Sequence, residues 1–564
     1  MPDESLPQVS TPALSTAVRF AWGLLIVVTL AVCYFSNLGA IGFVGPDEPR
    51  YAWIARDMAE TGDWITPRLY GKPWFEKPVL YYWMAGASFK LFGVSEAAAR
   101  LPSALCALFA TLALAWLAWR VYGEETARWL LLLLPTSVGM IGFSHAAATD
   151  MPFSAMLTIA MVFAAIVLGL TRNENTPILP RTPWLALLLF GFFLGLAVLA
   201  KGPAAIILSG GGVFFWALFT KRWRDAFRLL HPAAIASFCV TALPWYVLCA
   251  RRNPDFFRVF IIEHNFKRYL TPEFQHIQPF WFYIPVLLVE LLPWAAIAFG
   301  ALLGWCFDKS RFQLDARTYF LISWALFCIV FFSASKSKLP GYILPALPAI
   351  VFLVAIAMSH SNRIIARARV FGALAAGFVF SVIGLLPILI TSRNNSFILL
   401  PVVGALFGAL GIANLCIALA LSRRFSSNQR IVLQVLAIAP LLFLFAGVRK
   451  TVDRRWFWPK SPRNVASLLI RENIPAERLS TFRLRRDTQY ALSFYLHSEI
   501  HAWESSNPID GFVLTDGRPC RAMDTTWNCE ALWERRDLGD SVWSLLRVTP
   551  ATSAPGPTSG GQPR

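Results

Sequence analysis

Apolar runs long enough to cross a membrane recur along most of this chain. A transmembrane helix needs about 20 predominantly apolar residues, and thirteen such runs can be marked. They lie near residues 18–38, 98–118, 126–143, 151–170, 184–200, 203–219, 232–250, 280–304, 317–334, 339–357, 370–391, 397–421 and 432–448. A hydrophobic content of 56% and a mean hydropathy of +0.53 exclude an ordinary soluble chain. The sequence therefore predicts an α-helical polytopic membrane protein with about 13 transmembrane helices.

The basic residues indicate how these helices are oriented. Cytoplasmic loops carry an excess of Lys and Arg. With the N-terminus inside, the inside loops hold seventeen of them and the short outside loops four. This asymmetry predicts an external C-terminal region, and it explains the net charge of +18 without a nucleic-acid partner. Residues 1–17 lack the basic region and cleavage site of a signal peptide, so the first apolar run is expected to remain as a transmembrane helix.

The first outside loop concentrates charged and aromatic side chains in two segments, Gly45–Tyr51 and Trp74–Trp83. Together they contain the carboxylates Asp47, Glu48 and Glu76, the cations Arg50 and Lys77, and the aromatic residues Tyr51, Tyr81 and Tyr82. Charged groups beside hydrocarbon are costly unless they line a wet cavity or bind a charged ligand. We interpret this loop as the active site, with Arg50, Tyr51, Tyr81 and Tyr82 lining the substrate cavity.

A second outside segment, residues 251–279, is also basic and rich in aromatic residues. Its cations are Arg251, Arg252, Arg258, Lys267 and Arg268. Long loops are exempt from the charge rule, so a solvated loop is one reading. Phosphate binding explains the cations better, and the aromatic residues favour a position at the membrane interface.

The composition becomes more charged and mixed after about Thr451, which predicts a small water-facing α/β domain. Its expected elements are a helix at Ser461–Asn473 and strands at Leu479–Leu484, Gly511–Thr515 and Val542–Val548. The predicted domains are thus a membrane domain at 1–450, the α/β domain at 451–549 and a disordered tail at 550–564. Cys520 and Cys529 are predicted to form a disulfide, because the external compartment is oxidising.

Several motifs, in a fixed order, carry a resemblance to a known family. They are Asp47-Glu48-Pro49-Arg50-Tyr51, Gly62-Asp63-Trp64, Phe75-Glu76-Lys77-Pro78, Arg100-Leu101-Pro102-Ser103, Thr149-Asp150, Lys201-Gly202-Pro203 and Ser337–Pro345. Together they resemble the bacterial lipid A 4-amino-4-deoxy-L-arabinose transferases, members of the protein-mannosyltransferase-like group of GT-C integral membrane glycosyltransferases. The resemblance extends over about residues 18–450.

The resemblance implies a GT-C fold in the bacterial inner membrane, with the active site and the C-terminal domain facing the periplasm. The implied reaction is an inverting transfer of a sugar, such as 4-amino-4-deoxy-L-arabinose, from a polyprenyl (undecaprenyl) phosphate donor to lipid A or a related envelope acceptor. The expected partners are therefore this donor, this acceptor and membrane lipids.

Negative charge builds on the departing donor phosphate, so cations are expected to face it. The candidate phosphate-binding residues are Lys77, Lys201, Lys267, Arg268, Lys338 and Tyr342. Two alternatives remain open. Lys338 and its neighbour Lys336 can anchor a helix end at the interface, and Lys77 can form a surface ion pair with Glu76.

Three carboxylates are candidates for catalytic roles, namely Asp47, Glu48 and Asp150. In the related protein transferases the first-loop aspartate accepts a proton from the acceptor hydroxyl, which makes Asp47 the candidate general base. With an anionic phosphate acceptor, Asp47 would instead position the acceptor or balance a cation. Glu48 can alternatively pair with Arg50 to hold the loop, and Asp150 can cap the helix that follows it.

Glu76 and His264 are candidate ligands of a divalent metal ion. Similar positions in the aminoarabinose transferases are associated with such an ion near the donor phosphate, and zinc accepts both ligand types. Two protein ligands form only a partial shell, which phosphate oxygens and water would complete.

Other functions remain open. The sugar and the acceptor are not fixed by the motifs, so transfer to a protein or another glycan is an alternative. A lipid or sugar-lipid transporter would also have many spans, but it should show internal repeats with broken helices. The sequence shows no such symmetry.

Overall fold

A computed structural model describes most of the chain. The described residues are 16–171, 182–267, 277–300, 315–359, 363–390, 399–420, 429, 432–438, 442, 461–504, 510–516, 527–535 and 543–550. The chain divides into two compact units. The first comprises Met1–Ser36, Phe75–Leu80 and Ser103–Val448, and the second comprises Asn37–Trp74, Tyr81–Pro102 and Arg449–Arg564.

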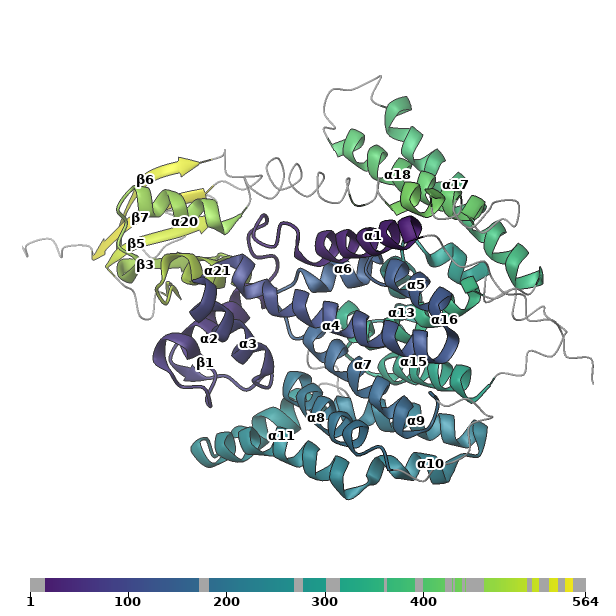
Figure 1. Ribbon diagram of the computed structural model, residues 1–564. Coiled ribbons are helices and arrows are strands. Elements are labelled where there is room, and N and C mark those ends of the chain that lie inside the picture. Colours follow the sequence, from purple (N-terminus) through teal and green to yellow (C-terminus); the bar gives the residue numbers. More distant parts are fainter. Residues whose placement is uncertain are drawn as a thin grey trace, which may run out of the picture. The chain divides into compact units, whose positions relative to one another are not determined.

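The first unit is helical (Figure 1). Its elements are α1 (Thr16–Phe35), α4 (Glu96–Tyr122, shared with the second unit), α5 (Glu124–Leu133), α6 (Val138–Ser144), α7 (Asp150–Val167), α8 (Trp184–Lys201), α9 (Ala204–Thr220), α10 (Trp223–Phe227), η1 (Arg228–Leu230), α11 (Pro232–Arg252), η2 (Arg258–Lys267), η3 (Phe280–Phe282), α13 (Tyr283–Glu290), α15 (Ala316–Ala334), η4 (Pro340–Tyr342), η5 (Leu344–Ala346), α16 (Leu347–Ser359), α17 (Arg363–Ile390) and α18 (Leu399–Ala420).

Many of these helices have the length and composition of membrane spans. Seven in the described part of the chain qualify outright, and an eighth does if α5 and α6, bent by 61° at their junction, count as one span. Four shorter apolar helices coincide with further predicted spans, whereas most of the run predicted at 432–448 lies outside the described residues. The polytopic helical fold is thus confirmed, and the number thirteen stays a prediction.

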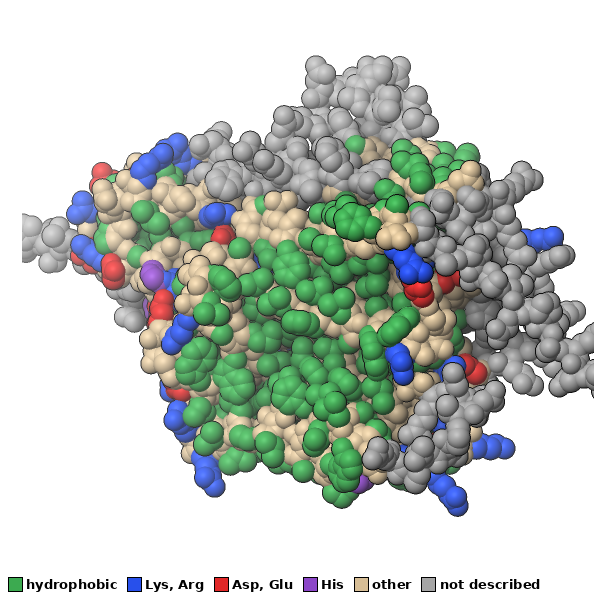
Figure 2. All heavy atoms as spheres, in the orientation of Figure 1, with side chains coloured by type: hydrophobic (Ala, Val, Ile, Leu, Met, Phe, Trp, Pro, Cys, Tyr) green, Lys and Arg blue, Asp and Glu red, His purple; other side chains and the backbone are tan. Residues whose placement is uncertain are grey.

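Apolar side chains also dominate the surface of these helices. Hydrophobic residues cover the helices at the centre of the view, with Lys and Arg mainly at the margins (Figure 2). Exposed examples are Val240 on α11, at 75%, and Phe20 on α1, at 74%. Contact with lipid rather than water accounts for such a surface, because a soluble chain rarely exposes large contiguous apolar patches.

The second unit contains most of the first loop, all but Phe75–Leu80, and this part is folded rather than extended. Helix α2 (Asp47–Thr61) has two acids in its first turn, which suits the helix dipole, and ends at Gly62 with φ 75°. A short hairpin of β1 (Arg68–Leu69) and β2 (Lys72–Pro73) follows, and then α3 (Leu80–Phe92), of which Tyr81–Phe92 belongs to this unit.

The C-terminal residues of the second unit form a five-stranded sheet. Its strands are β3 (Leu479–Phe482), β4 (His501–Ala502), β5 (Gly511–Asp516), β6 (Trp527–Arg535) and β7 (Trp543–Pro550), in the order β4-β3-β5-β7-β6. The pairs β3–β4 and β3–β5 are parallel, and the other two are antiparallel. Because strand side chains alternate, Leu514 and Leu545 pack in one core with α20 (Pro462–Arg471) and α21 (Arg486–Leu496), while Val513 and Leu546 face the other side with Trp503.

The predicted α/β domain is confirmed in its main elements. Ser461 caps α20, its side chain accepting the Arg463 N–H, and the three predicted strands are β3, β5 and β7. Prediction missed α21, β4 and β6. Cys529 is disulfide-bonded, but Cys520 lies outside the described residues, so the pairing of these two remains a prediction. The predicted boundary at 450 also lies outside them. The predicted tail at 550–564 is wrong at its first residue, because Pro550 ends β7, and the rest of it lies outside the described residues.

Candidate active site

Three residues predicted from the sequence meet in the first unit. Asp150, at the start of α7, forms an ion pair with Lys201, at the end of α8, at 2.5 Å. The Lys201 ammonium also lies 4.6 Å from the ring centroid of Tyr342 and 5.5 Å from that of Phe153. A cation held by a carboxylate and aromatic faces is fixed in place.

The loop that carries Tyr342 packs tightly against this ion pair. A Cβ atom on Gly341 would lie 2.6 Å from the Asp150 carboxylate. Only glycine therefore allows the approach, which gives a physical reason for the Lys-Leu-Pro-Gly-Tyr sequence. The alternative that Asp150 caps α7 is wrong, because Thr149 occupies the N-cap position and the Asp150 carboxylate binds Lys201.

Lys77 belongs to the same neighbourhood. It interacts electrostatically with Asp150, and its ammonium lies 4.0 Å from the Glu76 carboxylate. The side chains of Glu76 and Lys77 are only 11% and 12% exposed. The alternative of a surface ion pair is therefore wrong, and two lysines, Lys77 and Lys201, interact with one aspartate.

Lys338 is buried beside the end of α15. Its ammonium donates hydrogen bonds to the carbonyl oxygens of Ser335, at 2.5 Å, and Gln278, at 3.1 Å. Burial lowers the pKa of Lys338 below its usual range, and Lys336 adds to this effect. These bonds tie two loops together, and a phosphate contact of Lys338 remains a prediction.

The other candidates of the second outside segment are Lys267, Arg268 and His264. Lys267 ends η2 and is exposed, and Arg268 lies outside the described residues. His264 is partly buried on the same helix. Among the described residues, no three His, Cys, Asp or Glu side chains gather as a metal site.

The first-loop residues form their own cluster in the second unit. Arg50 donates to the Asp47 carboxylate at 2.6 Å, and its guanidinium lies 5.1 Å from the Tyr51 ring and 5.2 Å from the Trp74 ring. The Asp47 side chain is half exposed, whereas that of Arg50 is 13% exposed. Asp47 is therefore accessible to a solute while its partner is anchored by aromatic rings.

Three tyrosines pack together beside this cluster. The rings of Tyr51, Tyr81 and Tyr82 lie 5.9 to 6.2 Å apart, and all three are buried. The Tyr81 hydroxyl donates to the Ala99 carbonyl at 2.9 Å, and burial raises its pKa well above the usual range. These residues support the loop, and their predicted place in a substrate cavity stays a prediction.

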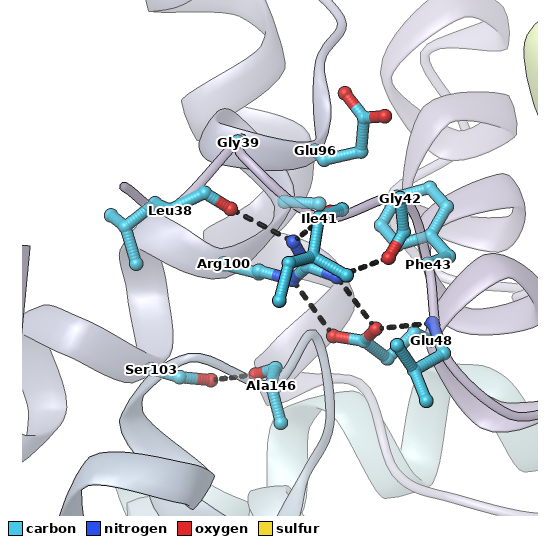
Figure 3. A network of polar contacts seen from close by, with 12 residues as sticks. Leu38, Gly39, Ile41, Gly42, Phe43, Glu48, Glu96, Arg100, Ser103 and Ala146 are labelled. Carbon is cyan, nitrogen blue, oxygen red and sulfur yellow. Dashed lines mark hydrogen bonds and ion pairs between the residues drawn. The ribbon is translucent and has the colours of Figure 1, made fainter. Parts of the chain in front are cut away.

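Glu48 pairs with a residue that was not among the sequence candidates. The alternative that Glu48 pairs with Arg50 stays untested, whereas Arg50 pairs with Asp47 and Glu48 pairs with Arg100 on α4 (Figure 3). Arg100 Nε and Nη2 donate to the two carboxylate oxygens at 2.9 and 2.8 Å. The other donors reach the carbonyl oxygens of Leu38, Ile41 and Gly42, at 2.8, 2.6 and 3.0 Å.

All five N–H donors of this guanidinium are therefore used. Glu48 also accepts the Val44 N–H at 2.8 Å. The side chains of Glu48 and Arg100 are both buried. This network fixes the entry into α2 beside Asp47. It gives Glu48 a structural use, and its predicted catalytic role is not needed to explain why a glutamate stands there.

Glu290 on α13 is a second residue that sequence reasoning missed. It is 5% exposed, and neither carboxylate oxygen has a hydrogen-bond partner among the described residues. It interacts electrostatically with Asp150. The available signal was a single carboxylate within the apolar run 280–304, since ionisable groups inside spans are rare and usually functional.

Comparison with known proteins gives a family. The profile of the dolichyl-phosphate-mannose-protein mannosyltransferase family matches residues 20–260. The undecaprenyl phosphate-alpha-4-amino-4-deoxy-L-arabinose arabinosyl transferase of Serratia proteamaculans is 31% identical over 469 residues, which cover 82% of this chain and 78% of the relative. The chain belongs to this arabinosyl transferase family.

Other comparisons agree with this membership. The transferase of the same name from Enterobacter sp. is 31% identical over 374 residues, and the alignment spans 65% of that relative's length. The crystal structure of ArnT from Cupriavidus metallidurans bound to undecaprenyl phosphate has a TM-score of 0.76 at 22% identity, covering 93% of this chain and 98% of that one. Its apo form has a TM-score of 0.75. The family fold is thus shared over nearly the whole chain.

Proposed function

We propose that this protein transfers a sugar from a polyprenyl-phosphate donor to lipid A or a related cell-envelope acceptor. The sugar is 4-amino-4-deoxy-L-arabinose by the family's name, and the reaction takes place on the periplasmic side of the bacterial inner membrane. The curated relatives are named for an undecaprenyl phosphate-linked aminoarabinose, and the Cupriavidus structure contains undecaprenyl phosphate.

The observation that carries the proposal is the partly buried cluster of Asp150, Lys201 and Tyr342, with Lys77 in electrostatic contact. The side chain of Lys201 is 10% exposed and that of Lys77 12%. In such an environment a cation interacts with an incoming anion more strongly than it would in bulk water. Lys201 and Lys77 would therefore hold the donor phosphate, and Asp150 would keep Lys201 oriented while the donor is absent.

In the reaction, the bond between the anomeric carbon and the donor phosphate oxygen breaks, and the acceptor oxygen forms a new bond to that carbon. The electron pair of the broken bond stays on the polyprenyl phosphate. The lysine cations stabilise this developing charge. Their interaction with the phosphate is stronger in the transition state than in the bound donor. An acceptor hydroxyl would give its proton to Asp47, whereas an anionic phosphate acceptor needs no base.

For the predicted divalent metal ion, the proposal provides only part of a ligand shell. Glu76 and His264 supply one oxygen and one nitrogen ligand, which is fewer than the three protein ligands usual at catalytic zinc. These two residues do not form a metal site by themselves, and no step above depends on a metal. A divalent ion, when bound, would add positive charge at the donor phosphate.

The proposal is tested by mass spectrometry of lipid A from cells that contain or lack the protein. The expected result is an aminoarabinose adduct that requires the protein and disappears with Lys201→Met and Asp47→Asn. Arg471→Glu, an exposed change on α20, is the matched control and should keep the adduct. Unmodified lipid A together with a newly glycosylated protein or other glycan would replace the acceptor named here.

A further inference from the structure

An apolar cavity lies among α8, α9, α10, η1 and α11. Its volume is about 440 Å³, and its walls include Phe190, Leu194, Val213, Phe214 and Phe238. These helices lie in the first unit, and none of the residues predicted for the active site lines the cavity. A cavity of this size accommodates a small ligand or a stretch of lipid chain.

The walls of the cavity favour an apolar occupant. Ser209 is the one hydroxyl residue in the lining, and its hydroxyl already donates to the Ile206 carbonyl at 3.2 Å. Apart from the indole of Trp223, the other lining side chains are hydrocarbon or glycine. At Gly210, an added Cβ would meet no atom within 4 Å, so the wall is open there.

Basic residues flank this cavity at one end. Residues 221–228 contain Lys221, Arg222, Arg224 and Arg228 against the single acid Asp225. Arg222 and Arg228 pair with Asp225 at 2.7 and 3.0 Å, and Arg222 also donates to the Leu168 carbonyl. Lys221 and Arg224 are exposed, and the surplus positive charge therefore faces outward beside Trp223, Ala226 and Phe227 of the lining.

This end has the character of a membrane interface. Phe227 and Leu230 are 64% and 63% exposed on the same short helices that carry the arginines. Apolar and basic side chains side by side on a short helix are typical of a segment lying in the lipid headgroup region. Helix α9 separates this end from Lys201 by 17 residues, which corresponds to about 25 Å.

We propose that this cavity binds an anionic phospholipid of the leaflet opposite to the Asp150–Lys201 cluster. An acyl chain enters the apolar cavity, and the headgroup phosphate binds Lys221 and Arg224. A soluble phosphate would leave the cavity unfilled, and a zwitterionic lipid would not neutralise the surplus charge. The site is separate from the proposed sugar transfer.

Native mass spectrometry of the full-length protein tests this proposal by counting lipids retained after addition of phosphatidylglycerol or phosphatidylcholine. Phosphatidylglycerol should be retained preferentially. The double variant Lys221→Glu/Arg224→Glu should weaken that retention about tenfold or more, since each basic residue near an anionic lipid is worth about fivefold. Gly210→Leu, which fills the open wall, should weaken the retention of both lipids to a comparable degree.

Two variants serve as controls. Gly23→Leu adds the same side chain at an open, exposed position on α1, and Arg471→Glu reverses an exposed charge on α20. Both should retain lipid as the unmodified protein does. Equal retention of the two lipids, or equal loss in the controls and the test variants, would overturn the proposal. Sugar transfer is not the readout, so failure here leaves the proposed function intact.

Discussion

At the scale of single residues, Arg100 is a buried cation whose hydrogen-bond donors are all used within the fold. Its guanidinium is 2% exposed and has a partner for every donor. Such an arginine has no donor left for a phosphate. A search of the sequence for donor-binding cations should therefore pass over Arg100, although it stands in one of the family motifs.

We predict that Arg100→Met destabilises the protein by about 3–5 kcal/mol, because it leaves the buried Glu48 carboxylate without its counter-charge. Thermal unfolding of purified protein measures the effect. The double variant Glu48→Met/Arg100→Met should recover part of the loss, as expected for coupled residues. Additive losses in the double variant would show that the two side chains are not coupled.

A second residue-scale prediction concerns Asp57 on α2. Burial raises the pKa of this carboxyl, and the negative charge of Glu499 adds to the shift. A raised pKa in the folded state means that the ionised carboxylate opposes folding. Its contribution to stability is therefore favourable below the unfolded pKa and is lost as pH rises through the folded pKa.

Asp57→Asn should accordingly raise the melting temperature at pH 7 and have a smaller effect at pH 4. The measurement is a thermal unfolding series across pH, with Glu530→Gln, an exposed change on β6, as control. A benefit of Asp57→Asn that grows toward acid pH would contradict the assigned sign.

At the scale of the elements, the apolar runs predicted the helices well and their irregularities poorly. Hydropathy alone located α7 and α8, because each is apolar nearly throughout. It could not predict the 61° bend between α5 and α6 or the 3-10 turns η4 and η5, which depend on local packing. The short strand β4 has two residues, too few for a period-two pattern.

Helix α13 provides an element-scale prediction. Glu290 places a carboxylate with no hydrogen-bond partner among the described residues in an otherwise apolar helix, which is costly. Glu290→Met, of similar length, should raise the melting temperature by removing this cost. Glu290→Gln should help less, because a buried amide still needs partners. A lower melting temperature for the methionine variant would mean that the carboxylate has a stabilising partner.

At the scale of the whole molecule, the order of motifs was more informative about the site than their spacing. Asp150, Lys201 and Tyr342 are far apart in sequence, and only folding brings them together. Sequence reasoning could nominate Asp150 and Lys201, because a charge at the end of an apolar run stands out. It nominated Tyr342 through the motif that contains this residue. It could not pair them, and it did not find the partner of Glu48, Arg100, which is 52 positions away.

The orientation of the molecule can be tested directly. A tag after Arg564 should be cleaved by a protease added outside the inner membrane, and a tag before Met1 should be protected, because the inside loops hold the excess of basic residues. A tag within the loop at 221–231 should be protected as well. Cleavage at the N-terminal tag alone would reverse the assignment of the Asp150–Lys201 cluster to the periplasmic face.

The packing of α2 against α21 has a consequence for synthesis. Arg56 on α2 donates to the Phe494 carbonyl at 2.8 Å, across 438 positions of sequence. At a translation rate of about 5–20 residues per second, α2 leaves the ribosome roughly 20 to 90 seconds before its partner exists. The loop that contains Asp47 must wait in an incomplete state during that time. A chain cut short near its end would therefore keep every motif of the first loop and still lose the helix against which that loop folds.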